Sequence, residues 1–297
     1  MSGAAWALLA GAGFGIFQTI NRIALRQMGV YLSTFLQLVV STAVLASIAW
    51  LTTDVRRVGH APPAALAYFA AGAFVHFFVG WTLLNAGQKR IGAARTSPLI
   101  STSPLFATAI AAVALRELPS LPALAGIAVT VAGVYVISVE QPAAAARATP
   151  APADRTGVLY GLAASLCWAV SPVFVRHGLA GLPSPLLGLT LGLVPCVIAY
   201  AVGMLWRREE FDGARRSEAL YYKVVAGALV GLSQWARWIA LDLAPVGVVL
   251  ALSQISVPLV LVLSPLVGNR HGESVTPRLW AGAALTVAGV LLLIVTQ

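Results

Sequence analysis

The sequence predicts an all-α integral membrane protein, with ten transmembrane helices in two five-helix inverted-topology repeats around a central cavity. The first observation is composition: 59% of the 297 residues are hydrophobic and 10% are charged, against roughly 25% charged residues in a soluble domain. The second is a series of apolar segments of about 20 residues, the length that spans a bilayer as a helix. The third is an internal repeat. This composition excludes a soluble enzyme, a disordered chain and a secreted disulfide scaffold, and the near-continuous apolar segments exclude a β-barrel.

Loop-type residues separate the apolar segments. Charged stretches follow the second and seventh segments (DVRRVGHAPP and WRREEFDGARRSEA). The stretch EQPAAAARATPAPADRT between the fifth and sixth segments is Ala/Pro-rich, which is typical of a semi-rigid linker. We therefore expect a first repeat at 1–139, a linker at 140–156 and a second repeat at 157–297. The expected spans are 4–26, 31–51, 64–87, 92–115, 121–138, 157–177, 185–205, 220–242, 246–268 and 278–296.

Similar sequences recur in the two halves at a nearly constant offset. AGIAVTVAGV at Ala125–Val134 and AGAALTVAGV at Ala281–Val290 share eight of ten residues at an offset of 156. AGAFV at 71–75 matches AGALV at 226–230 at an offset of 155. Because each half has an odd number of spans, the two halves cross the bilayer in opposite directions. Inverted repeats of this kind are typical of secondary transporters, whose substrate site lies near the midplane between the repeats.

The net charge of +9 arises mainly from arginines in short loops. Basic loops mark the cytoplasmic side of a membrane protein, so the charge does not indicate a nucleic-acid partner. The loops on the side of the two termini hold only Arg56, Arg57, Arg116 and Arg176, with Arg237 ambiguous. The opposite side, with Lys223 counted there, holds the other basic residues. This distribution predicts that both termini lie outside the cell.

Patterns of catalysis and metal binding do not occur inside the expected spans. Cys167 and Cys196 lie in apolar segments and fit neither a disulfide framework nor a metal-ligand spacing. No GxSxG, HExxH or acidic pair lies inside a span. We therefore expect no catalytic residue, no metal and no cofactor, and a membrane-embedded enzyme is the least favoured alternative.

Two basic side chains are the leading candidates for a substrate site. His76 lies near the middle of the third span, where an ionisable residue is a functional candidate and a histidine can carry a proton. The alternative is a neutral histidine bonded to a neighbouring helix. Arg237 shares one face of the eighth span with Gln234 and Trp238, and this combination fits a carboxylate beside an apolar group. The alternative is an arginine that snorkels to the interface near Asp242.

The fourth and ninth spans carry helix breakers at matching positions. Proline frees backbone carbonyls, which only protein or a wet cavity can satisfy, so paired breakers indicate a substrate site or a hinge. The alternative is simple kinked packing. The candidate hinge residues are Pro98, Pro104, Pro258 and Pro265, and Ser101 and Gln254 are candidate cavity residues beside them.

Several of these segments resemble the drug/metabolite transporter (DMT) superfamily. FGIFQTINRIAL (14–25) and SLCWAVSPVFVRHGL (165–179) resemble the first span of each half, and IGAARTSPLISTSPLFATAIAAVALREL (91–118) resembles the fourth. AGxxxTVAGV resembles the fifth. Over its whole length the chain is similar to EamA-type ten-helix transporters, which include bacterial amino-acid and metabolite exporters. The resemblance implies a cavity lined by spans one to four and six to nine. It also implies a place in the bacterial inner membrane with both termini in the cytoplasm, opposite to the charge distribution.

The first span differs from that of the small multidrug members of this superfamily, which carry a membrane-embedded Glu for cation antiport. Gln18 and Asn21 occur here instead, and no acidic residue precedes Asp54 or lies centrally in a span. A buried cation needs a counter-charge, so antiport of multivalent cations is not expected. Trp168 and Ser171 in the sixth span join Gln18 and Asn21 as candidate binding residues.

These features predict a secondary transporter that exports or exchanges small organic metabolites, such as amino acids with an aromatic or other apolar side chain, by alternating access. The alternative is a carrier of an anionic or phosphorylated lipid or metabolite, which the basic composition favours. The expected partners are a small-molecule substrate and the lipid bilayer. The chain is expected to be a monomer or a homodimer. Glycine pairs in the fifth and tenth spans permit close helix packing, either within one chain or between two chains. These pairs are Gly126 with Gly133 and Gly282 with Gly289.

Overall fold

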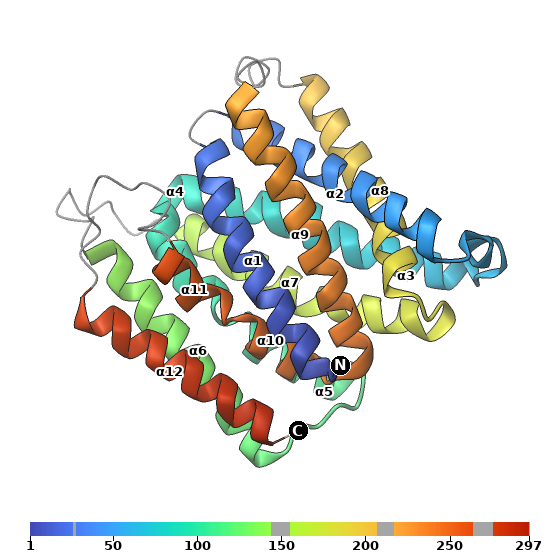
Figure 1. Ribbon diagram of the computed structural model, residues 1–297. Coiled ribbons are helices and arrows are strands. Elements are labelled where there is room, and N and C mark those ends of the chain that lie inside the picture. Colours follow the sequence, from blue (N-terminus) through green and yellow to red (C-terminus); the bar gives the residue numbers. More distant parts are fainter. Residues whose placement is uncertain (26–27, 144–154, 207–216, 264–275, 297) are drawn as a thin grey trace.

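The computed structural model describes residues 1–25, 28–143, 155–206, 217–263 and 276–296. Every regular element in these ranges is a helix (Figure 1). Eight helices are long and apolar enough to cross a membrane, and two shorter apolar segments, Ser103–Ala114 and Val246–Val260, lie where the fourth and ninth spans were expected. The predicted all-α fold with ten spans is therefore confirmed.

The helices of the two halves follow each other in corresponding order. The first half contains α1 (Gly3–Leu25), α2 (Val30–Thr52), the short η1 (Val55–His60), α3 (Pro63–Ala73), the π-helix η2 (Phe74–Gly80), α4 (Trp81–Ile100), α5 (Ser103–Ala114) and α6 (Leu121–Ala143). The second half contains α7 (Arg155–Gly181), α8 (Pro185–Trp206), α9 (Ser217–Leu243), α10 (Val246–Ser253), α11 (Ser256–Leu263) and α12 (Pro277–Val295). Helices α6 and α7 thus extend into both ends of the expected linker.

The chain reverses its direction inside α4. A Cβ atom added to Gly87 would lie 3.5 Å from the methyl carbon of Thr96, nine residues later. Nine residues of straight helix rise about 13.5 Å, so the chain folds back between these two residues. The third span therefore consists of α3, η2 and the start of α4, and the fourth consists of the end of α4 and α5.

Corresponding helices of the two halves make equivalent contacts with the opposite half. Helix α1 packs against α9, α10 and α11, and its counterpart α7 packs against α3, η2, α4 and α5. Helices α2 and α8 meet each other, and so do α6 and α12. Each first span therefore contacts the third and fourth spans of the opposite half, which is the reciprocal packing expected of an inverted repeat.

The repeated glycines form the contact between α6 and α12. A Cβ atom on Gly133 would lie 2.7 Å from the carbonyl oxygen of Gly282, and one on Gly289 would lie 2.8 Å from that of Gly126. The two contacts are equivalent under the repeat, and the reversed order of the residues makes the helices antiparallel. These glycines therefore bring two helices of one chain together, which is one of the two uses expected from the sequence.

Cutting the chain between the halves should leave them associated, because the packing of α1 on α9, α7 on α3 and α6 on α12 crosses from one half to the other. We expect a protease site placed at Ala151 to yield two fragments that elute together in mild detergent, with transport retained. Uncut protein of the same variant is the control. Separation of the fragments would show that the covalent connection holds the halves together.

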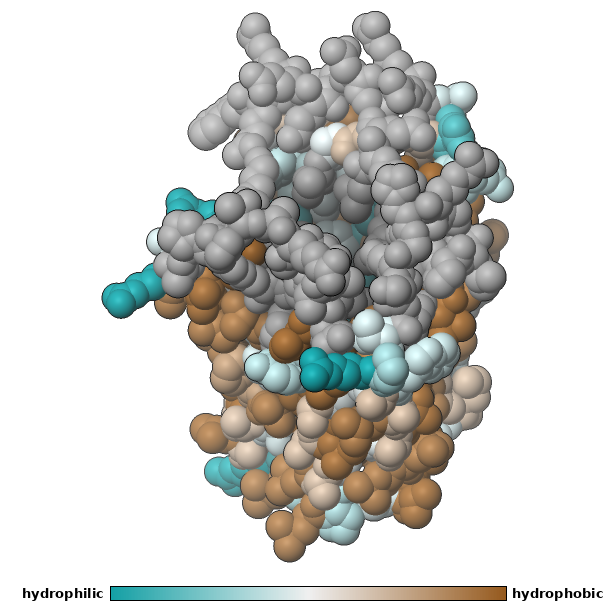
Figure 2. Space-filling view, turned by 90° about the vertical axis from the view of Figure 1, so that its left-hand side faces the viewer, coloured by the Kyte–Doolittle hydropathy of each residue, from teal (hydrophilic) through white to brown (hydrophobic). Residues whose placement is uncertain are grey.

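Hydrophobic residues cover most of the described surface in Figure 2. Large apolar side chains such as Leu51, Val113 and Leu205 are at least 75% exposed. A soluble protein rarely exposes so much apolar surface, whereas in a bilayer these side chains face lipid. The polar side chains that are buried instead lie between helices, where they are available for a site.

Both chain ends lie at the same end of the bundle (Figure 1). Gly3 packs against Ala244, at the end of α9. We call this end the terminal face and the opposite end the loop face. Lys223 does not belong to the loop face as the charge count assumed, because it lies within α9 and is only 1% exposed. Many of the other basic residues lie outside the described residues, so the position of the termini outside the cell stays a prediction from the sequence.

A fluorescent protein fused after Gln297 should therefore remain dark in cells, because such proteins mature poorly when exported to the outside. The positive-inside rule supplies the physical reason, since basic loops remain in the cytoplasm. Fusion of the same reporter to a loop-face connection is the matched control and should fluoresce. A bright C-terminal fusion would place the termini in the cytoplasm.

Candidate functional site

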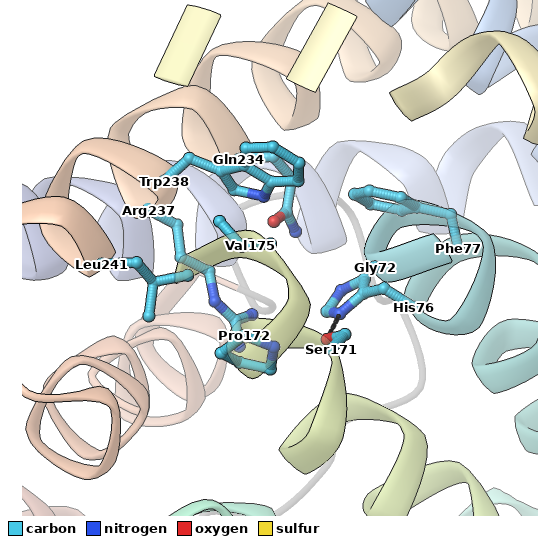
Figure 3. A pocket seen from close by; sticks show the side chains of 10 residues that line it. All are labelled: Gly72, His76, Phe77, Ser171, Pro172, Val175, Gln234, Arg237, Trp238 and Leu241. Atoms are coloured by element: carbon cyan, nitrogen blue, oxygen red, sulfur yellow. Dashed lines mark hydrogen bonds between the residues drawn. The ribbon is translucent and has the colours of Figure 1, made fainter. Parts of the chain in front are cut away.

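A cavity lies between α3 and η2 of the first half and α7 and α9 of the second (Figure 3). Its position between the halves matches the place where transporters with inverted repeats bind their substrates. Its lining combines polar, aromatic and aliphatic side chains. The lining residues are Gly72, His76, Phe77, Ser171, Pro172, Val175, Gln234, Arg237, Trp238 and Leu241.

Small residues and a π-helix bring these side chains together. A Cβ atom on Gly72 would lie 3.0 Å from the Cβ atom of Phe174 and 3.2 Å from the carbonyl oxygen of Ser171, so a larger residue here would press α3 away from α7. The π-helix η2 follows and contains His76. π-Helical turns are rare and often occur at functional sites. Here the wider turn contains the buried residues His76 and Phe77, which both line the cavity.

His76 forms polar and aromatic contacts with α7. Its Nδ1 atom lies 3.0 Å from the Ser171 hydroxyl, shown by the dashed line in Figure 3. The ring stacks on Trp168 with centroids 5.8 Å apart, and the Trp168 indole N–H donates to the His76 carbonyl at 3.3 Å. Three residues proposed from sequence thus meet, with Trp168 supporting His76 from outside the cavity lining.

We expect His76→Ala to lower stability and leave the pH profile of transport unchanged. A proton on His76 would place a second cation in the same cavity as Arg237, which like-charge repulsion opposes. The loss of one hydrogen bond and a ring contact should cost about 1–2 kcal/mol, seen as a lower melting temperature in detergent. Ser171→Ala removes the same hydrogen bond and is the matched control. A changed pH profile in His76→Ala alone would make His76 the coupling group.

Arg237, Gln234 and Trp238 enter the cavity from one face of α9, as their spacing predicts (Figure 3). Gln234 and Trp238 are buried, and Trp238 packs against Phe69 with ring centroids 5.6 Å apart. Arg237 is partly buried. No carboxylate lines the cavity, and no described residue forms an ion pair with Arg237. The site therefore offers a guanidinium, an amide and an indole to an incoming solute.

An ionic cluster lies next to the cavity at the terminal face. The Arg176 guanidinium pairs with the Glu117 carboxylate at 2.7 Å and donates to the backbone carbonyls of Leu241, at 2.6 Å, and Asp242, at 3.1 Å. The second oxygen of Glu117 accepts the backbone N–H of Val246 at 2.8 Å. We call Arg176 and Glu117 with these backbone partners the terminal clamp. It ties α5 and α7 to the connection between α9 and α10.

The end of α5 is shaped to present Glu117. Arg116 adopts a left-handed backbone with φ of 58°, and the N–H of Glu117 returns to the carbonyl of Ala111 at 3.2 Å. A left-handed residue after the helix end is common, and it is usually glycine. The Glu117 carboxylate thereby reaches across to α7 and pairs with Arg176.

The other candidates from the sequence lie outside the cavity lining. Gln18 is partly buried on α1, and Asn21 accepts a hydrogen bond from Lys223. The Ser101 hydroxyl lies 3.3 Å from that of Ser138 on α6. Gln254 ends α10 and is partly buried.

The fourth and ninth spans are interrupted at matching places. Helix α4 ends at Ile100 and α5 begins at Ser103, with Pro104 buried in its first turn. Helix α10 ends at Ser253 and α11 begins at Ser256, with Pro258 buried at its third position. Pro98 lies inside α4 with its side chain outside the described residues, and Pro265 lies outside the described residues altogether.

The sequence did not single out Gly72, Phe77, Pro172 or Val175 as lining residues. They are small or apolar residues in apolar spans, so nothing in their pattern separates them from residues that face lipid or core. The cavity between these ten residues has a volume of about 10 Å³, which is room for about one water molecule. Ligand sites usually measure about 300–1,000 Å³, so the helices around it must separate to admit a metabolite.

The fold and cavity define a polytopic membrane protein with the architecture of an inverted-repeat transporter. Residues 1–139 and 155–295 match the EamA-like transporter family. The chain belongs to this family, which is part of the DMT superfamily, and it is a multi-pass membrane transporter of small molecules.

A solved structure described only as "Crystal structure of protein" has the same fold. It superposes with a TM-score of 0.77 at 20% sequence identity, covering 98% of this chain and 99% of the other. The search of curated proteins found no match.

Proposed function

We propose that the protein exports or exchanges a small metabolite that carries a carboxylate, such as an amino acid with an aromatic or other apolar side chain. Transport proceeds by alternating access, and the bacterial inner membrane is the proposed location. Arg237 is the observation that carries this proposal, because it reaches the cavity without an acidic partner among the described residues.

The chemistry of the site fits such a solute. A guanidinium binds a carboxylate through two parallel hydrogen bonds. The Gln234 amide, beside Arg237 in Figure 3, offers both a donor and an acceptor to further polar groups. Trp238 and Phe77 provide apolar surface for a side chain. The lack of a carboxylate in the lining disfavours a purely cationic solute, since a buried cation needs a counter-charge.

An anionic or phosphorylated lipid or metabolite is the second candidate. It is favoured by a second buried cation, Lys223, which also lacks an acidic partner among the described residues. Arg237 would then bind a phosphate rather than a carboxylate.

Proteoliposome transport separates the two proposals. Purified protein would be tested for uptake and counterflow of radiolabelled amino acids, and in parallel for exchange of phosphorylated sugars and of a short-chain fluorescent phospholipid. Amino-acid counterflow that requires Arg237 supports the first proposal. Movement of the phosphorylated probes alone supports the second. Activity with neither class, in vesicles that retain folded protein, contradicts both.

A further inference from the structure

A buried lysine lies where α1, α2 and α9 meet. The Lys223 side chain is 1% exposed. Its ammonium donates to Oδ1 of Asn21 at 2.5 Å and to Oε1 of Gln37 at 2.9 Å. Both acceptors are neutral amides, and no described residue forms an ion pair with Lys223. A buried ammonium without a counter-charge is costly, so this residue needs an explanation beyond packing.

The same cluster can also hold the neutral amine. Gln37 is 1% exposed, and its amide nitrogen has no hydrogen-bond partner among the described residues. The Ser33 hydroxyl, one turn earlier on α2, is equally buried and unpartnered. Both groups are donors. An ammonium uses the amide oxygens as acceptors, whereas an amine has a lone pair that can accept from one of these donors.

No acidic side chain in the described part of the chain forms an ion pair with Lys223. Helices α1, α2, α7, α8 and α10 pack against α9. The facing residue of α1 is the neutral Asn21, and α10 carries no titratable residue. Among described side chains, the remaining titratable or charged groups are Tyr31 on α2, Cys196 and Tyr200 on α8, Arg155, Tyr160, Cys167, Arg176 and His177 on α7, and Glu218, Tyr221, Tyr222, Arg237 and Asp242 on α9.

We propose that Lys223 is a proton-binding site that couples proton movement to transport. When the proton leaves, one N–H bond of the ammonium breaks, its electron pair stays on Nζ, and water takes the proton. The lone pair then accepts a hydrogen bond from the Gln37 amide. Proton binding reverses the step. The proposal rests on the chain being a transporter and not on the identity of its substrate.

Loss of the charge weakens the contact between three helices. Charge-assisted hydrogen bonds are roughly twice as strong as neutral ones, so the ammonium holds α1 and α2 more firmly to α9 than the amine does. Arg237 lies 14 residues further along α9, which is about 21 Å of helix. Lys223 lies near the loop-face end of α9, whereas the terminal clamp holds its other end. Proton exchange at Lys223 therefore changes how tightly one end of the substrate-binding helix is held.

The protonation of Lys223 can be measured directly, because the chain has only two lysines, Lys89 and Lys223. Full-length protein labelled with ε-¹³C lysine gives two side-chain signals, and Lys89→Arg leaves the one from Lys223. In lipid nanodiscs we expect this signal to move between its ammonium and amine positions from mildly acidic to mildly alkaline pH. A signal that keeps one position over the whole range in which the protein stays folded would overturn the proposal. This measurement needs no substrate and no variant at Lys223.

Transport gives the second test, with whichever amino acid or phosphorylated probe the wild-type protein moves. Lys223→Met should lose accumulation driven by a proton gradient and the matching signal of a pH-sensitive dye inside the vesicles. Counterflow exchange of the same probe should persist, which also shows that the variant is folded. Lys89→Met is the matched control and should retain both activities. Undiminished gradient-driven accumulation in Lys223→Met would overturn the proposal. A wild-type protein that moves none of the probes would contradict the proposed function. The NMR signal of Lys223 would still decide whether Lys223 is a proton-binding site.

Discussion

Replacing Glu117 with Gln should open the cavity to the terminal face. The substitution keeps the shape of the side chain but removes its charge, so Arg176 loses its counter-ion and the N–H of Val246 loses an anionic acceptor. A hydrogen bond to a charged group contributes about 1.5–3 kcal/mol. The side chains of Arg176 and Glu117 are 29% and 15% exposed, and solvent screens part of the effect. We therefore expect the lower end, about a ten-fold shift toward the open form.

A cysteine in the cavity would report this opening. Leu241 lines the cavity, and its carbonyl accepts from Arg176. Leu241→Cys, in a background without the native cysteines, should react about ten-fold faster with a membrane-impermeant thiol reagent added at the terminal face when Glu117 is also replaced. Substrate accumulation should fall, because a transporter that fails to close one face leaks.

Asp242→Asn is the matched control for the terminal clamp. It removes a negative charge close to Arg176, but Arg176 bonds to the carbonyl of Asp242 and that carbonyl remains. Its reaction rate should equal that of the wild-type background. Exchanging the two charges by Glu117→Arg with Arg176→Glu should rescue closure only in part, because Arg cannot accept the N–H of Val246. Equal labelling rates in Glu117→Gln and the control would show that the clamp does not close this face.

The overall fold could be predicted because membrane insertion and repetition leave strong signals in sequence. Hydrophobic length identifies a span without knowledge of its neighbours. The odd number of spans per half then gives the inverted topology. The glycine pairs of α6 and α12 could be recognised as a repeated motif. The helix against which each pair packs could not be predicted, because small residues allow close approach to any helix. The reversal inside α4 also has no clear signal, since it falls within a stretch that continues to form helical turns.

The lining of the candidate cavity could be predicted where a single helix provides it. Helical spacing alone places Gln234, Arg237 and Trp238 on one side of α9, and the structure turns that side to the cavity. Contacts between helices were not predictable in this way. The meeting of His76 with Ser171 joins residues 95 positions apart through the close approach of two spans. Single-span periodicity contains no information about such a pair.

Lys223 shows how a span boundary can mislead. The sequence places it three residues inside an expected span, shortly after a charged loop, and a lysine there usually snorkels to the interface. In the structure α9 begins at Ser217, and Lys223 points between α1 and α2, toward Asn21 and Gln37. The two amide oxygens that accept hydrogen bonds from Lys223 belong to other helices. Only tertiary packing could distinguish an interfacial lysine from a buried one.

Arg237→Gln should weaken substrate binding about ten- to hundred-fold. A bound carboxylate would lose a charge-assisted hydrogen bond worth about 1.5–3 kcal/mol, and each 1.4 kcal/mol changes the affinity by about a factor of ten. Arg237→Lys should restore only part of the affinity, since an ammonium lacks the planar fork that binds both carboxylate oxygens. The apparent affinity would be measured by counterflow in proteoliposomes, with the amount of folded protein checked in detergent.

Arg116→Gln provides the matched control for Arg237. Arg116 is an exposed arginine at the end of α5, outside the cavity, so its replacement removes one positive charge without touching the site. Its affinity should equal that of the wild-type protein. The three Arg237 forms then separate two roles by their order: a carboxylate site ranks Arg above Lys and Lys above Gln, whereas an interfacial anchor makes Lys equal to Arg. Unchanged affinity in Arg237→Gln for every transported solute would rule out Arg237 as the residue that binds the substrate carboxylate. Binding would then depend on the neutral groups around it, Gln234 and Trp238, and not on a carboxylate held by Arg237.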